Sequence, residues 1–268
     1  MRRSIVALVL AVAFGAVACQ GQPVRLLTDP KDILVAAAST TATATSVHLD
    51  LTVDGPIQFD PLGTGAGAAL DLKGTTASAD LDLAGNRLRA TFASPQLMNV
   101  SGELIALDDS AYLKSTLTGP NYLAQPVAPS GGSSAAPSVH PLAGLSDLLS
   151  RSDLKPVKGD DVPCAGGTCY TVTLHLTLDD LAALGGGTTG GGPIPSLPAL
   201  PGIPLPNLSD ATADVGIHVE QASTRLSGID ATLHLGDLGT PHLVATFTKW
   251  NEAVTIAAPP PDQVQAMP

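Results

Sequence analysis

The chain has few aromatic residues and few positive charges: 3% of its 268 residues are Phe, Trp or Tyr, and it has 13 Lys and Arg compared with 24 Asp and Glu. A net charge of -11 argues against a nucleic-acid partner, because phosphate binding requires a basic face. Three cysteines are too few for a disulfide scaffold or a zinc module. After residue 18 no apolar run approaches the length of a membrane-spanning helix, about 18 residues or more.

Motifs that carry chemistry are also missing. The sequence has no G-x-S-x-G elbow, no H-E-x-x-H helix, no P-loop and no dinucleotide fingerprint. The acidic pairs 108–109 and 160–161 fall in predicted turns, which explains their composition. The polar positions of predicted strands hold four histidines without recognised ligand spacing: His48, His175, His218 and His234. We therefore predict solvated histidines, no metal site, no catalytic residue, no cofactor and no enzyme.

Residues 1–18 have the pattern of an export signal. Arg2 and Arg3 precede an apolar stretch that ends in Ala16-Val17-Ala18, directly before Cys19. This pattern resembles a bacterial lipobox, although Ala16 stands where Leu is usual. The alternative is ordinary cleavage after Ala18, which would leave Cys19 unmodified. We expect lipidation of Cys19, which would anchor the chain to the outer side of the cytoplasmic membrane.

The other two cysteines, Cys164 and Cys169, flank Ala-Gly-Gly-Thr. Outside the cytoplasm such a pair can close a small disulfide. A zinc site is the competing interpretation, but no second Cys or His pair lies nearby in the sequence. The sequence favours the disulfide.

The predicted organisation is a signal peptide at 1–18, a tether at 19–29 and a single domain at 30–268. Asp29-Pro30 predicts the start of a helix that runs to about Thr43. Period-two alternation then predicts nine or ten strands joined mostly by short turns, including 46–53, 170–178, 215–219, 229–235, 243–249 and 254–257. The fold class is therefore α+β, with a mainly antiparallel sheet.

Two short helices and two irregular segments interrupt the strands. Helices are predicted at 140–151 and after Thr177, which could pair with Asp180 in a capping box. Flexible loops are predicted at 126–139 and at 185–206. The second loop is apolar and Pro-rich, so it is either a cover over a cavity mouth or a flexible insertion.

Several segments resemble the mycobacterial lipid-carrier lipoproteins of the LppX/LprG family. The cysteine and an Ala/Thr-rich helix precede T-S-V-H-L-D-L-T-V-D-G (45–55), which is the most specific match. Residues 109–113 resemble the family's turn before an aromatic strand, and 142–151 resemble its Gly-Leu helix. Residues 246–256 resemble the closing S-x-W-G-x-P-V-x-V strand pair, with Asn251 and Ala253 in place of Gly and Pro. The likeness covers most of residues 31–260.

The resemblance implies a curved half-barrel sheet whose concave side, lined by helices, encloses an apolar cavity. It implies a membrane-anchored envelope lipoprotein that binds acylated lipid or glycolipid and helps transport it, with a membrane transporter as a candidate partner. The alternative is a structural or interaction lipoprotein without lipid cargo, for which the Pro-rich segment 193–206 would be the docking element.

Alternation of apolar and polar residues also predicts which side chains face the covered side of the sheet. Such a face either packs directly on helices or leaves room for an apolar guest. The expected cavity residues are Val47, Leu49, Leu51, Leu88, Phe92, Tyr112, Leu174, Leu176, Leu233 and Phe247.

Overall fold

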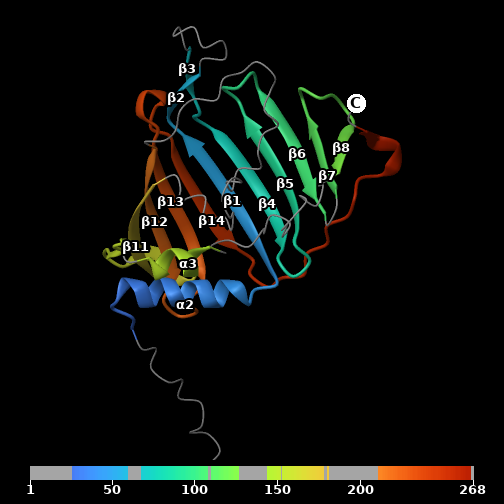
Figure 1. Ribbon diagram of the computed structural model, residues 1–268. Coiled ribbons are helices and arrows are strands. Elements are labelled where there is room, and N and C mark those ends of the chain that lie inside the picture. Colours follow the sequence, from blue (N-terminus) through green and yellow to red (C-terminus); the bar gives the residue numbers. More distant parts are fainter. Residues whose placement is uncertain are drawn as a thin grey trace, which may run out of the picture.

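The computed structural model describes residues 26–59, 68–107, 110–126, 144–151, 153–177, 180 and 211–266. Figure 1 shows an open, curved antiparallel sheet with two α-helices on one side. The helices are α2 (Pro30–Ala42) and α3 (Leu145–Ser150), with short 3-10 helices η1 (Gly236–Leu238) and η2 (Pro261–Gln263). The strands are β1 (Ser46–Asp54), β2 (Pro56–Phe59), β3 (Ala68–Asp71), β4 (Thr75–Asp82), β5 (Arg87–Ser94), β6 (Val100–Ala106), β7 (Ser110–Ser115), β8 (Tyr122–Pro126), β9 (Val157–Lys158), β10 (Val162–Cys164), β11 (Gly167–Thr177), β12 (Thr212–Glu220), β13 (Leu226–His234), β14 (His242–Thr248) and β15 (Val264–Ala266).

The large sheet has the order β10-β11-β12-β13-β14-β1-β4-β5-β6-β7-β8-β15, with β9 beside β11, while β2 and β3 form a separate hairpin. Every pairing is antiparallel except that of β15 with β8. Strand β1 lies in the middle because β14 pairs with one of its edges and β4 with the other. The predicted α+β fold with a curved, mainly antiparallel sheet is confirmed.

Helix α2 forms where the sequence predicts it. The Asp29 side chain accepts a hydrogen bond from the Lys31 backbone N–H (2.8 Å), and Pro30 occupies the first helical position. One side of the helix is buried, through Ile33, Leu34, Ala37, Ala38 and Thr41. This side packs against α3, β11 and β12, so the helices cover the sheet on the side of the late strands (Figure 1).

One of the expected short turns and the predicted capping box are present. Residues 83–86 form the turn between β4 and β5, where the Gly85 N–H donates to the Asp82 side chain (2.9 Å). Thr177 and Asp180 make the reciprocal bonds of a capping box: each backbone N–H donates to the other residue's side chain. Helix α3 begins at Leu145 within the described residues. The predicted start at 140, the predicted helix at 181–184 and the loop at 185–206 lie outside them, as does the loop predicted at 126–139 except for Pro126, which ends β8.

The C-terminal strap, which we define as residues 252–266, corrects one prediction. The sequence predicts a strand at 254–257, but these residues join no ladder. The strap instead runs to the far edge of the sheet, where β15 pairs with β8 (Figure 1). Ile256 is buried there with Ile105 and Tyr122, in a cluster separate from the main core.

The link between β14 and the strap explains one departure from the family pattern. Asn251 stands where Gly is usual, and its φ is +61°, a conformation that Asn tolerates better than most residues. Its side-chain oxygen accepts a hydrogen bond from the Thr45 N–H (2.8 Å), just before β1. The substitution therefore preserves the turn and ties it to the start of the sheet.

Candidate functional site

Strand register places nine of the ten expected cavity residues on one face of the sheet. In an antiparallel pair, residues opposite one another project to the same side. The pairs Leu49↔Phe247, Val47↔Leu81 and Leu81↔Leu88 therefore link β14, β1, β4 and β5 on this face, and Leu176↔Ala213 and Ala213↔Leu233 extend it across β11 to β13. We call it the concave face; its predicted members are Val47, Leu49, Leu51, Leu88, Phe92, Leu174, Leu176, Leu233 and Phe247.

Tyr112 is the exception. It pairs with Ile105, whereas the neighbouring residues Leu113 and Leu104 pair on the concave face. Tyr112 packs against the second cluster, with Val254 and Val264 of the C-terminal strap. Its placement in the cavity was wrong, because the apolar segment 111–113 has only three residues, too few to show which of them face inward.

The concave face divides into two regions of different burial. The packed region lies beneath α2 and α3; of the predicted residues, Val47, Leu174, Leu176 and Phe247 belong to it and are at most 7% exposed. Leu49, Leu88 and Leu233 are partly buried at its border. The open region comprises residues that remain partly exposed outside the main core: Leu51, Ala77, Phe92, Leu104 and Leu113.

Phe92 is the centre of the open region. It lies opposite Gly102, where an added Cβ would come within 2.7 Å of the ring carbon Cζ, so the missing side chain makes room for the ring. Two open hollows of about 490 and 430 Å³ border Phe92, but most of their lining residues belong to the opposite face of the sheet, among them Glu103 and Lys114 in the first and Asp50 and Thr52 in the second.

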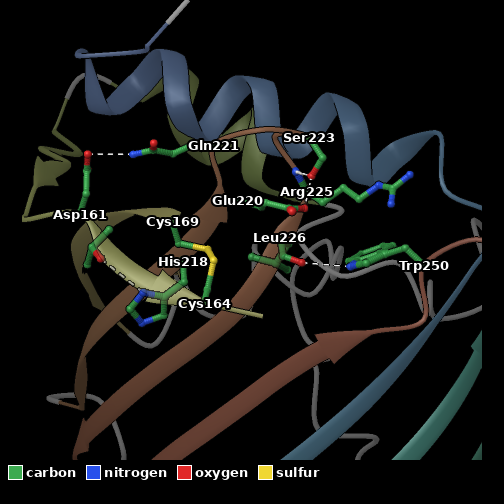
Figure 2. The surroundings of a disulfide bond; sticks show 11 residues. Asp161, Cys164, Cys169, His218, Glu220, Gln221, Ser223, Arg225, Leu226 and Trp250 are labelled. Carbon is green, nitrogen blue, oxygen red and sulfur yellow. Dashed lines mark hydrogen bonds between the residues drawn. A yellow bond between two sulfur atoms is a disulfide. The ribbon is translucent and has the colours of Figure 1, made fainter. Parts of the chain in front are cut away.

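The expected disulfide is present. Cys164 and Cys169 are joined with an S–S distance of 2.04 Å and a Cα–Cα distance of 5.8 Å (Figure 2). The bond closes the hairpin between β10 and β11 at the edge of the packed region. Beside it the Gln221 side chain donates to Asp161 (2.8 Å), so the hairpin is also tied to the end of β12. Because both sulfurs are in the disulfide, they are not zinc ligands.

All four histidines that the sequence singled out lie on the opposite, convex face and contact carboxylates. His48 bonds Asp80 (2.6 Å) and His218 bonds Asp230 (2.6 Å). His175 and His234 each lie 2.9 Å from a different oxygen of Asp214. These bonds, from His175 first, lower the pKa of Asp214. Within the described ranges, no group of three or more His, Cys, Asp or Glu is arranged as a metal site.

A polar cluster that the sequence did not reveal lies on the convex side of β5 to β8. Glu103 accepts hydrogen bonds from the Tyr122 hydroxyl and from Arg89 Nε, both at 2.6 Å, and Lys114 Nζ lies 5.4 Å from the Tyr122 ring centroid. Burial would raise the pKa of Glu103, but the bonds from Tyr122 and Arg89 outweigh burial and lower it. The same bond raises the pKa of Tyr122. Only strand pairing could bring these residues together.

The predicted anchor, Cys19, lies outside the described residues, as do the signal peptide and most of the tether. In the part of the chain that the structure describes, neither α-helix has the length and apolar character needed to cross a membrane.

No protein-family model matches the chain, and no curated protein matches it either. Several solved structures, in contrast, are similar to it. LprF from Mycobacterium bovis is 15% identical, with a TM-score of 0.50 over 87% of this chain and 98% of its own. The Mycobacterium tuberculosis lipoprotein LppX is 16% identical, with a TM-score of 0.49 over 85% and 98%. A LolA superfamily protein from Nitrosomonas europaea is 10% identical, with a TM-score of 0.25 over 88% and 96%.

At this level of identity the likeness to LprF is evidence for the fold alone. It agrees with the open curved sheet and with the resemblance found in the sequence. The chain therefore shares the fold of LprF, as its sequence resemblance to the LppX/LprG family implied.

Proposed function

We propose that this chain is an envelope lipoprotein, anchored outside the cytoplasmic membrane through Cys19, which binds an acylated lipid or glycolipid on its concave face and carries it through the envelope. The observation that carries the proposal is the open region. There the concave face stays apolar beyond the cover of α2 and α3, and Leu51, Phe92 and Leu104 remain partly exposed. Exposed apolar surface of this kind favours an apolar guest.

The energetics agree with an acyl chain as the guest. Each methylene removed from water contributes about 0.8 kcal/mol, so a chain of about 16 carbons would gain on the order of 12 kcal/mol before ordering costs. The sequence resemblance to the LppX/LprG lipid carriers supports the same function. Binding and release of a lipid require an apolar site that keeps the acyl chain out of water, and they require no covalent reaction.

The direct test is native mass spectrometry with lipid extraction, on the chain purified from an actinobacterial host. We expect an acylated species bound in stoichiometric amount, and a mass at Cys19 that includes the lipid anchor. A lipid-free chain that takes up no offered glycolipid would contradict the proposal and favour a structural or interaction lipoprotein.

A matched pair of variants locates the site. Leu51 is partly exposed on the concave face, whereas Thr52 is exposed and projects from the opposite face of the same strand. Leu51→Asp places a charge against the acyl chain and should reduce lipid loading at least about tenfold, because an unpaired charge is costly in an apolar site. Thr52→Asp should leave loading unchanged. Equal loading in both variants would show that the lipid lies elsewhere.

A further inference from the structure

Two protruding turns at one end of the open region carry exposed hydrophobic side chains. Met98 is 83% exposed and Leu117 is 65% exposed. They lie in turns 95–99 and 116–121, which connect β5 to β6 and β7 to β8. Two hydrogen bonds tie the second turn to the start of β6, just after the first turn: the Thr116 N–H donates to Ser101 O (2.9 Å), and the Ser101 N–H donates to Thr116 Oγ1 (3.2 Å). We call these two turns the apolar rim.

Met98 has an unfavourable backbone conformation, and its apolar side chain is exposed to water. Its φ is +50°, in the left-handed region that costs most L-residues roughly 1–2 kcal/mol and that Gly or Asn normally fills. An exposed methionine gains no packing energy in return. A residue that is costly in both respects points to a role outside folding.

The surroundings of the rim indicate what it contacts. Neither turn contains a charged residue, although 14% of the whole chain is charged. The adjoining turn at 73–74 reaches Pro95, since a Cβ on Gly74 would lie 3.9 Å from the Pro95 ring, and this turn presents the exposed Lys73. Uncharged apolar tips beside a cation suit an anionic lipid surface, where the tips enter the headgroup boundary.

The rim is continuous with the open region. Phe92 lies three residues before the turn at 95–99, and Gly102, opposite Phe92, pairs with Ser115 directly before the turn at 116–121. In Figure 1 the rim lies at the end of β5 to β8 opposite the end that α2 occupies, where the chain enters at Leu26. Docking through the rim would therefore leave the tethered end free.

We propose that the apolar rim docks on a lipid bilayer, with Met98 and Leu117 inserted at the boundary between headgroups and acyl chains. In that position the open region around Phe92 adjoins the bilayer, so an acyl chain can pass between the bilayer and the concave face with little exposure to water. The docking step stands on the rim alone, whereas the passage of lipid rests on the proposed function.

The test is flotation of the full chain with phosphatidylcholine vesicles, with and without phosphatidylglycerol. Cys19→Ser removes the anchor site from every protein compared. Met98→Asn with Leu117→Ser should reduce the vesicle-bound fraction at least about tenfold, because the double variant lacks the two apolar side chains that would insert into the bilayer. The matched control, Val35→Ser with Val157→Ser, removes two exposed hydrophobics from elsewhere on the surface and should leave binding unchanged.

The rim variant also separates docking from misfolding. Asn tolerates a positive φ, so Met98→Asn should leave the melting temperature equal or raise it while binding falls. Lys73→Gln should remove only the preference for phosphatidylglycerol.

The rim proposal is overturned if the parent protein ignores both kinds of vesicle, or if the rim and control pairs bind equally. A chain that carries lipid yet shows no rim-dependent docking would refute this inference alone. A chain that docks through the rim but holds no lipid would refute the proposed cargo function and leave docking intact.

Discussion

The packed and open regions of the concave face have the same pattern in the sequence and different roles in the structure. Leu174 and Leu104 both occupy apolar positions of alternating strands, yet Leu174 is fully buried and Leu104 is partly exposed. The difference arises because α2 packs against β11 and β12, at one side of a very wide sheet. Alternation decides which face is apolar, and the extent of the helices decides how much of that face becomes core.

The largest effect should come from truncating the packed region. Leu174→Ala should lower the free energy of unfolding by about 2–5 kcal/mol, because the cavity it leaves lies inside a close-packed core. Leu104→Ala, the matched change in the open region, should cost about 1 kcal/mol or less. Urea unfolding of both variants measures the difference, and equal losses would remove the distinction between the two regions.

A somewhat smaller loss is expected at the edge of the packed region. Replacing Cys164 and Cys169 together with Ser should cost about 2 kcal/mol, since the disulfide closes only a short loop. Amide exchange should accelerate in β10 and β11 and stay unchanged in β5 and β6. Uniform acceleration across the sheet would show that the two regions unfold as a single unit.

The smallest effect is expected on the pH dependence of the free energy of unfolding, through Glu103 on the convex side of the open region. The pKa of Glu103 is lowered in the folded chain, so its stabilising contribution is complete above the unfolded value of about 4.3 and is lost as pH falls through the folded value. Glu103→Gln should therefore reduce stability near neutral pH and flatten its decline at acidic pH. Unfolding free energies measured across that range test this, and an unchanged slope would contradict it.

Local chemistry made much of the fold predictable. The Asp29-Pro30 start of α2 and the turn at 83–86 depend on neighbours in the sequence, so their residue types were sufficient. The disulfide spans only four intervening residues. Long alternating segments, such as β1 and β11, also showed which of their residues share a face, because each holds enough residues to establish the parity.

Predictions failed where the evidence was short or non-local. The segment 111–113 is too short to show its parity, and Tyr112 lies on the other face. Residues 254–257 alternate like a strand, but they pair with no strand and instead pack Val254 and Ile256 into the second cluster as part of the strap. The cluster of Glu103 with Arg89 and Tyr122 joins three strands, so strand register alone assembled it.

The sequence by itself determined the class of fold, the apolar face of the long strands, the start of α2 and the pairing of two cysteines, because all of these depend on residue type and short spacing. The tertiary structure decided which part of the apolar face is core and which is open, how Phe92 lies over Gly102, and how the turn at 116–121 is tied to the start of β6. Those outcomes depend on which strands are neighbours and on how far the helices extend across the sheet, and both are set by contacts between residues far apart in the chain.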